Sequence, residues 1–368
     1  MGRFQFSLAS SSDDAQLRAR MRLDRMEGDI AISFRREPSY FAAAKLHGDS
    51  VEVIKCVDTA SDEIIGLGNR STLDAFVDGK KQRIGYLSDL RGAPQYRKGM
   101  LLARGYQYLR KLHEQDPVPL YYTVIYEGNH AAFENLLGAR AGLPAYHDFG
   151  SILTPAIHLD FPKSALRLQG VKVVSAQRSD LPKIVEFLNA AQSEKQFAPV
   201  YREADFYDGR FAGMVAEDFF LAIANDKIVG SLAAWDQKSL RQTHVESYSS
   251  RLAGIRPFYN LAARFSPLKA LPKIGERIPY IYFSCLAAAR NDQQIMRVLF
   301  RSAYNALRKG PWHYAIAGLH ATDPLASVLH EYRRIPAAGR LFVVSYESQD
   351  AQLAQLKHRV PYLEAGCL

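Results

Sequence analysis

The sequence predicts a mixed α/β (α+β) protein made of two similar units. A chain of 368 residues exceeds one ordinary compact core at about 150 residues per domain. Helical and strand periodicities alternate along it. The same order of elements then returns after residues 155–170, which carry two prolines and one glycine and no long periodic pattern. We therefore expect domains at 1–160 and 171–368, joined by a linker at 161–170.

Within the first unit, we expect helices at 15–27, 101–113 and 129–137 and strands at 51–57, 63–77, 83–90 and 120–126. Leu102, Tyr106 and Leu109 fall on one face of the second helix. Gly138 would end the third helix. Gly66 and Gly68 suggest a bulge in the strand at 63–77.

The second unit repeats this order. We expect strands at 171–176, 280–287, 313–319 and 341–346, and helices at 293–307 and 324–332. Another helix would begin at Ser179 as N-cap, with Pro182 in its first turn. A hairpin is expected at 219–235, with Asn225 and Asp226 in the turn.

Composition excludes several classes of protein. Hydrophobic residues make up 48% and charged residues 23%, which rules out wholesale disorder. The three cysteines are far apart and lack C-x-x-C spacing, so neither a disulfide scaffold nor a cysteine zinc site is expected. The histidines form no ligand pattern, and no metal is expected. No segment is long and apolar enough to span a membrane, and no signal-peptide core begins the chain, which favours a cytoplasmic protein.

The net charge of +9 suggests an anionic partner or simply a solvated surface. Basic residues are scattered and form no dense tract, which favours a small polyphosphate ligand over nucleic acid. Residues 1–168 hold 22 basic and 20 acidic residues, net +2, so residues 169–368 carry the remaining +7. Either a solvated surface or a binding partner could account for the +7 of residues 169–368.

The most informative segment runs from residue 85 to residue 102. A predicted strand ends at a Gly-Ala-Pro turn, and an Arg-Lys-Gly loop then opens an amphipathic helix. The free N–H groups and positive dipole end of such a helix can bind phosphate, and Arg97 and Lys98 add charge there. Gly99 would let the backbone approach closely. An ordinary strand-to-helix turn with solvated basic residues is the alternative.

Asp89-Leu90-Arg91, Pro94, Tyr96-Arg97 and Gly99 resemble motif A of the GNAT superfamily of N-acyltransferases. The resemblance implies that the backbone of Leu90, Arg91 and Gly92 pairs with the pantetheine arm of coenzyme A. It also implies a pyrophosphate site formed by Arg97, Lys98, Gly99, Met100 and Leu101. Only Gly99 remains of the family's Gly-x-Gly, so pyrophosphate binding could be weaker or arranged differently.

Asn129 and Ala132 resemble the family's motif B, whose Asn helps to hold the cofactor. The family's tyrosine general acid is replaced here by Leu136. The resemblance spans most of residues 1–160, and the matching order at 280–292 lacks the phosphate loop. It implies two GNAT-like domains, the second degenerate, each with a mixed, mostly antiparallel sheet flanked by helices.

The implied reaction is direct attack of an amine on acetyl-CoA or another acyl-CoA. Asp89 is the candidate general base, or else a turn or cap residue. Glu127 is the second carboxylate candidate. Tyr126 or Tyr122 could be the acid, although buried aromatic residues commonly serve only the core.

Arg36 and Tyr40 are candidates for the acceptor pocket. A plain salt bridge and a core aromatic are the alternative. The acceptor is expected to be a small-molecule or peptide amine, and the oligomeric state stays open.

Two other functions are kept. The chain could bind acyl-CoA without turnover, as a sensor, which the shortened glycine loop favours. It could also be an aminoacyl-tRNA-dependent transferase, because paired GNAT-like domains occur in peptidoglycan cross-bridge enzymes. The lack of a clustered basic stripe argues against the tRNA function.

Overall fold

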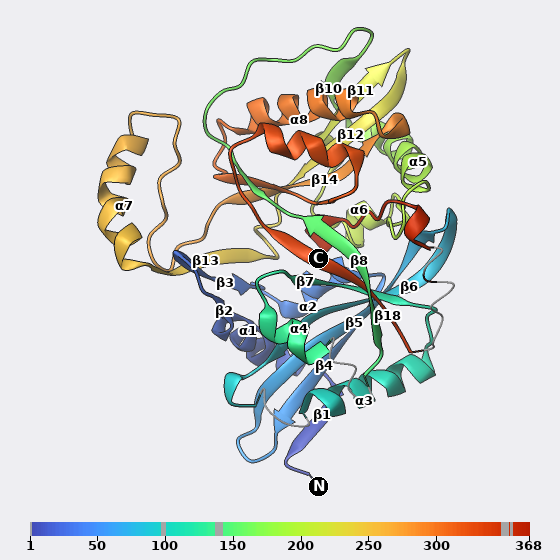
Figure 1. The fold of residues 1–368 in the computed structure, drawn as a ribbon, viewed down its shortest axis with the longest axis vertical. Helices are drawn as coiled ribbons and strands as arrows, with labels where there is room; N and C mark the ends of the chain where they lie inside the picture. The colour runs from blue at the N-terminus through green and yellow to red at the C-terminus, as the bar shows by residue number, and fades with distance from the viewer. Residues whose placement is uncertain (1, 97–100, 137–142, 347–352, 354–355) are drawn as a thin grey trace.

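The computed structural model describes residues 2–96, 101–136, 143–346, 353 and 356–368, and two large sheets dominate it (Figure 1). The first has eight strands, in the spatial order β1 (Phe4–Leu8), β4 (Ser50–Asp58), β5 (Glu63–Val77), β6 (Lys80–Gly92), β7 (Tyr121–Tyr126), β18 (Ala338–Ser345), β8 (Ala145–Leu153) and β16 (Leu319–His320). The second has seven, in the order β10 (Lys172–Ser175), β11 (Phe219–Ala224), β12 (Lys227–Trp235), β14 (Tyr280–Ala288), β15 (Tyr314–Ala317), β9 (Ala156–His158) and β17 (Arg334–Ile335).

Both sheets are mostly antiparallel, and each contains one parallel pair, β6–β7 in the first and β14–β15 in the second. A small third sheet joins β13 (Gln242–Tyr248), β3 (Ile30–Arg35) and β2 (Arg25–Met26). Helices cover the sheets, so the predicted class of a mixed, mostly antiparallel α/β fold is confirmed.

Helices cover opposite faces of the first sheet. Val53 and Ile54 are consecutive in β4 and therefore point to opposite faces. Val53 packs with α1 (Asp14–Leu23) and α2 (Tyr40–Ala44), whereas Ile54 packs with α3 (Leu101–Gln115). α4 (His130–Leu136) follows β7.

The second sheet is covered in the same way. Leu221 and Ala222 of β11 face α5 (Leu181–Gln192) and α8 (Gln293–Leu307), respectively. Two further α-helices with described bounds are α6 (Asp205–Asp208) and α7 (Ser250–Ala263). Short 3₁₀ turns complete the described elements: Ser11–Asp13, Lys45–His47, Pro94–Tyr96, Arg178–Asp180, Ala216–Asp218, Ala289–Asn291, Pro324–Glu331, Leu356–His358 and Ala365–Cys367.

Several expected elements agree with the structure to the residue, namely the strand at 63–77, the helix at 293–307 and the hairpin turn at Asn225 and Asp226, whose φ angles are 48° and 58°. Others need correction. Ser179 is not an N-cap, because it lies inside a 3₁₀ turn and α5 begins after Asp180. The element expected at 324–332 is a 3₁₀ helix.

The two halves of the chain exchange strands. β9 precedes the predicted linker but joins the second sheet, while β16 and β18 follow it and join the first. The strand expected at 313–319 divides into β15 and β16, which lie in different sheets. Residues 161–170 run against α8, where the Arg301 guanidinium donates to the Ser164 carbonyl at 2.6 Å. The division at 161–170 therefore stays a prediction.

Each sheet carries a β-bulge on the strand that begins its parallel pair. Asn69 of β5 pairs with Ser88 of β6 and Leu67 pairs with Arg91, so two residues of β6 face Gly68 alone. The first of these two is Asp89, with φ at 50°. The bulge predicted in this strand is present, because Ile65, next to Gly66, is an extra residue of β5 opposite β4. At Gly68 the extra residue belongs to β6. Such bulges re-aim side chains and commonly lie beside active sites.

Candidate functional site

The site lies where β6 and β7 separate. These two parallel strands pair only at Gly85↔Tyr121 and Tyr86↔Tyr122 within the described residues. Beyond that point β6 continues beside β5, and β7 continues beside β18. Leu90 on β6 and Tyr126 on β7 are 53% and 46% exposed. Apolar side chains therefore flank the region where the two strands part.

Asp89 lies at the centre of a buried polar network on this bulge. One carboxylate oxygen, Oδ2, accepts from the Tyr40 hydroxyl at 3.2 Å and from the Asn69 amide at 3.4 Å. The other, Oδ1, lies 3.5 Å from the Arg36 guanidinium, and both charged side chains are only 9% exposed. The structure thus brings Asp89 together with Arg36 and Tyr40, which lie 53 and 49 positions earlier in the chain.

The bulge makes this network possible. Consecutive residues of a regular strand point to opposite faces. Ser88 and Asp89 instead belong to one network. Ser88 Oγ lies 3.1 Å from His47 Nδ1, and the Asn69 amide nitrogen contacts both His47 and Asp89. The positive φ at Asp89 turns its carboxylate to this side, and Asp is among the residues that tolerate that conformation.

His47 is neutral and contacts both halves of the chain, through Ser88 and Arg241. Its Nε2 faces the guanidinium of Arg241, which can only donate, so the ring proton is assigned to Nδ1 and directed at Ser88 Oγ. Burial, reinforced by the charge of Arg241, lowers the pKa of His47 to about 3. Arg241 also donates to the Gly366 carbonyl at 3.0 Å, which anchors it in the second half of the chain.

The carboxylate of Asp89 is ionised. Burial alone would raise its pKa, but the positive charges of Arg36, Arg91 and Arg241 outweigh burial and hold the pKa of Asp89 well below its usual range. Burial and the Asp89 charge together raise the pKa of Tyr40 well above its usual value, so its hydroxyl stays a donor.

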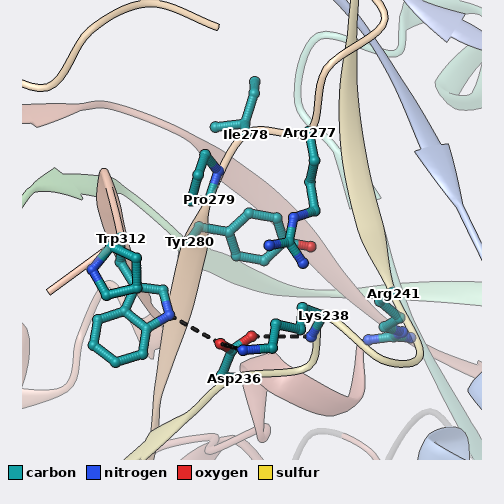
Figure 2. A pocket seen from close by; sticks show the side chains of 9 residues that line it. Asp236, Lys238, Arg241, Arg277, Ile278, Pro279, Tyr280 and Trp312 are labelled. Atoms are coloured by element: carbon teal, nitrogen blue, oxygen red, sulfur yellow. Dashed lines mark hydrogen bonds and ion pairs between the residues drawn. The ribbon is translucent and has the colours of Figure 1, made fainter.

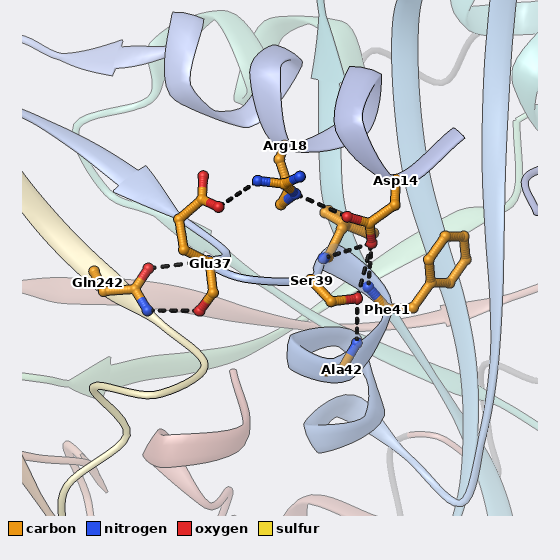
Figure 3. Close-up of polar contacts among 8 residues, drawn as sticks. Asp14, Arg18, Glu37, Ser39, Phe41, Ala42 and Gln242 are labelled. Carbon is orange, nitrogen blue, oxygen red and sulfur yellow. Dashed lines mark hydrogen bonds and ion pairs between the residues drawn. The ribbon is translucent and has the colours of Figure 1, made fainter. Parts of the chain in front are cut away.

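The loop that carries Arg36 and Tyr40 is held from both sides (Figure 3). Asp14 Oδ1 accepts from Ser39 Oγ at 2.8 Å and from the Tyr40 backbone N–H at 2.9 Å. Gln242 binds both backbone groups of Glu37, at 3.0 and 2.8 Å. Because Gln242 belongs to β13, the second half of the chain helps to fix this loop.

A cavity of about 150 Å³ opens beside the network (Figure 2). Its wall includes three cationic side chains, Lys238, Arg241 and Arg277, and one carboxylate, Asp236. Asp236 is already engaged by Lys238 at 3.3 Å and by the Trp312 indole N–H at 3.1 Å. Arg241 joins this cavity to His47, and its charge also acts on Asp89.

Two arginines of the cavity wall, Arg241 and Arg277, have N–H donors without a hydrogen-bond partner among the described residues. Arg241 Nε is buried and has no hydrogen-bond partner among the described residues. Arg277 forms no side-chain hydrogen bond or ion pair with another residue in the described ranges. The cavity is therefore electropositive.

The other predicted site residues lie around the strand ends. Glu127 follows β7, is exposed, and accepts from Ser151 Oγ at 2.7 Å rather than joining the Asp89 network. Asn129 caps α4 by accepting from the Ala132 N–H at 3.2 Å. Arg91 and Gly92 end β6, and Leu101 begins α3. Arg97, Lys98, Gly99 and Met100 lie outside the described residues.

The bulge of the second sheet has the same form but different surroundings. Ala233 pairs with Ser284 and Ser231 with Ala287, so Cys285 and Leu286 face Leu232 alone, and φ at Cys285 is 52°. The Cys285 N–H donates to Glu364 at 2.8 Å, and the Leu286 N–H donates to the Tyr362 hydroxyl at 3.0 Å.

Residues 361–367, named here the tail segment, thus cover the second bulge. Leu286 is 1% exposed, whereas its counterpart Leu90 is 53% exposed. Gly318 allows this close packing, since a Cβ there would lie 2.4 Å from Ala365 Cβ. Cys285 is fully buried as expected, and burial raises the pKa of its thiol well above the usual value.

His47, Asn69, Ser88 and Arg241 are the network residues that the sequence did not reveal. Arg241 lies 194 positions from His47 in the chain. Arg241 directly precedes β13, which pairs with β3 of the first half, so no local pattern could have identified its contact with His47. Among the described residues, no three metal-ligating side chains cluster.

Comparison of the sequence with protein-family models and with curated proteins finds no match. Solved structures do resemble the chain. A GCN5-related N-acetyltransferase from Sphaerobacter thermophilus superposes with a TM-score of 0.57 at 11% identity, covering 94% of this chain and 97% of that one. N-myristoyltransferase from Saccharomyces cerevisiae, solved with myristoyl-CoA, gives 0.60 at 10% identity, covering 95% and 80%.

A GCN5-related glucosamine N-acetyltransferase region of a fungal multi-domain GH3 β-N-acetylglucosaminidase gives 0.60 at 11% identity, covering 92% of this chain and 38% of that one. The chain therefore has the GNAT fold, as its motifs predicted. Identities this low establish the fold and leave the activity to the site itself.

Proposed function

We propose that the protein is an acyl-CoA-dependent N-acyltransferase whose reaction centre is the Asp89 bulge. The observation that carries this proposal is the charged network on a bulge at the point where two parallel strands separate. In the proposal, the thioester lies between β6 and β7, against Leu90 and Tyr126. Acyl-CoA is the substrate class that the similar structures support, since one was solved with myristoyl-CoA.

The proposed reaction forms a C–N bond and breaks the C–S bond of the thioester. An unprotonated amine attacks the carbonyl carbon, and the nitrogen then becomes a strong acid. An ionised Asp89 can accept the proton released at this stage even though its pKa is low, because the donor is more acidic than a free ammonium. The coenzyme A thiolate leaves and takes up a proton from solvent to become the thiol, while Asp89 releases the proton it accepted, so the proton lost by nitrogen balances the one gained by sulfur.

The acceptor is proposed to enter through the cavity beside Arg241. Lys238 is paired with Asp236 there, which leaves Arg241 and Arg277 as the cations with unpaired N–H donors. A guanidinium binds a carboxylate in a planar, often bidentate geometry. The proposed acceptor is therefore a small amine that also carries a carboxylate, with Tyr280 and Trp312 forming an aromatic wall.

The second sheet is proposed to be a copy that no longer binds acyl-CoA. The tail segment supplies hydrogen-bond acceptors to the bulge amides Cys285 and Leu286, which a pantetheine arm would otherwise need. The matching bulges support the proposal that residues 1–160 and 171–368 derive from one unit.

One observation favours the sensor function. Asp89 already has three polar partners and a strongly lowered pKa, which suits a structural ion pair as well as a base. Binding without turnover is therefore the second candidate, and a pair of assays separates the two functions.

The test is calorimetric titration of the protein with acetyl-CoA and longer acyl-CoAs, followed by thiol release against a panel of amines. Asp89→Asn should keep acyl-CoA affinity within about threefold and lose at least about 100-fold in turnover. Asp148→Asn, which removes a surface partner of Arg340, is the matched control. Binding without thiol release would establish the sensor, and no binding of any acyl-CoA would overturn both functions.

A further inference from the structure

Residues 249–275 form a projecting arm. It leaves the body after β13, runs through α7, and returns to pair with β13, where the Gly275 N–H donates to the Val245 carbonyl at 2.7 Å. Figure 1 shows α7 standing apart from both sheets. No residue of α7 is buried. The arm is therefore anchored at its base and, on its returning leg, by the bond from Lys269 to the Gly310 carbonyl, while α7 stays exposed.

The outward face of the arm is apolar. Ile255, Phe258, Leu261 and Phe265 follow one another at intervals of three or four residues, which places them on one side of the helix and its continuation. Phe258 is 75% exposed and Phe265 is 85% exposed, more than any other large hydrophobic side chain in the described ranges. Ile274, on the returning leg, is also exposed. Contiguous exposed apolar surface of this kind marks an interaction site.

Internal hydrogen bonds hold this face outward. Asn260 binds both backbone groups of Leu271, at 2.8 and 3.1 Å, which joins α7 to the returning leg. The Tyr248 hydroxyl donates to the Pro272 carbonyl at 2.7 Å. The polar side of α7 thus contacts the returning leg of the arm, and the apolar side faces away from it.

The charge of the arm identifies the partner. Residues 250–275 contain five basic residues, Arg251, Arg256, Arg264, Lys269 and Lys273, and no acidic residue. Lys269 donates to the Gly310 carbonyl, and Arg256 lies over the Tyr248 ring. Arg251, Arg264 and Lys273 are exposed; Arg251 lies in α7, Arg264 is its C-cap and Lys273 lies on the returning leg.

We infer that the arm binds the surface of an anionic lipid bilayer. Phenylalanine and aliphatic side chains on a protruding helix can enter the acyl boundary, while flanking Arg and Lys meet anionic headgroups. Among the described residues, no helix is long and apolar enough to cross a membrane, so the attachment is peripheral. The arm carries +5 of the net charge of +9, and this accounts for most of the basic excess in the second half of the chain.

This inference is independent of the proposed function, because vesicle binding needs neither acyl-CoA nor turnover. The base of the arm does lead into the cavity wall, since Arg277 and Tyr280 follow it directly. Membrane attachment would therefore place the acceptor cavity close to the lipid surface.

The test is co-sedimentation of the full chain with vesicles of phosphatidylcholine alone and with about one third phosphatidylglycerol. The wild type should bind the anionic vesicles at least about tenfold more tightly than the neutral ones, and added salt should weaken binding. Phe258→Ser with Phe265→Ser should reduce binding at least about tenfold. Leu23→Ser, which changes an exposed apolar residue outside the arm, is the matched control.

Circular dichroism melting would verify that the variants fold. The inference is overturned if the wild type fails to bind anionic vesicles, or if the double Phe variant binds them as tightly as the wild type. If the wild type does not bind vesicles but sediments as a dimer, and the double Phe variant sediments as a monomer, the apolar face binds a second copy of the chain instead.

Discussion

Asp89 and Cys285 occupy matching places in the two sheets. Each is the first of two residues that face one residue across a bulge, and their φ angles are 50° and 52°. Each bulge lies on the strand that begins a parallel pair. The surroundings differ, because Asp89 lies in a charged network and Cys285 is sealed beneath the tail segment. One backbone feature therefore supports a candidate reaction centre in one sheet and a packed core in the other.

The Arg36–Asp89 pair should couple strongly in stability. Removing either charge leaves the other buried and uncompensated, so Arg36→Gln and Asp89→Asn should each lower the free energy of unfolding by about 3 kcal/mol. The double variant should lose less than the sum, with a coupling of at least about 1 kcal/mol. Urea unfolding measures all four proteins. The exposed Arg83–Asp116 pair is the control, and a coupling no larger than its own would contradict the prediction.

His47 should make the protein sensitive to acid. Its pKa is about 3 in the folded protein and about 6.5 when unfolded, so the unfolded state binds the proton first as pH falls. Its contribution to stability is complete above pH 6.5 and should decline by about 1.4 kcal/mol per pH unit below it. Unfolding of wild type and His47→Asn at pH 7 and pH 5 isolates this slope. Equal slopes in the two proteins would refute the assignment of a neutral, buried His47.

The tail segment should stabilise the second bulge through single hydrogen bonds. Tyr362→Phe would leave the Leu286 N–H buried without its acceptor, at a cost of about 1–3 kcal/mol in the free energy of unfolding. Tyr207→Phe removes an exposed hydroxyl and should cost less than about 0.5 kcal/mol. Acyl-CoA affinity should be unchanged in both variants. A loss of acyl-CoA binding in Tyr362→Phe would mean that the second sheet takes part in binding.

Arg277 should determine the preference for a carboxylate in the acceptor. The proposed cavity predicts that an amino acid is acylated at least about tenfold more efficiently, in kcat/KM, than the amine that lacks its carboxylate. Arg277→Ala should remove most of this preference and leave acyl-CoA affinity intact. Arg251→Ala, on the nearby arm, is the control. A preference that survives Arg277→Ala would place the acceptor elsewhere.

Local patterns predicted the elements of this fold well where one segment decides its own structure. The helix at 293–307 and the hairpin at 219–235 depend on periodicity and turn residues, which the sequence carries directly. The placement of β9, β16 and β18 could not be predicted. Each pairs in the sheet formed mainly by the other half of the chain, and such pairing depends on tertiary contacts that the local sequence does not show.

The candidate site was predictable only in part for the same reason. Asp89 was identified from the resemblance, Arg36 and Tyr40 were named as acceptor-pocket candidates, and the structure joins all three through contacts that no spacing reveals. His47 and Arg241 also belong to the network, although they lie 194 positions apart in the chain. The sealing of the second bulge depends on Tyr362 and Glu364, which have no local signature.

The most direct test of the account is hydrogen–deuterium exchange of the full protein with and without a bound acyl-CoA. The account predicts slower exchange at the backbone amides of residues 89–92 and 123–126, where β6 and β7 separate. It also predicts no change at residues 284–288, whose bulge amides the tail segment already engages. Protection at 284–288 without protection at 89–92, or no protection in either region from an acyl-CoA that binds, would contradict it.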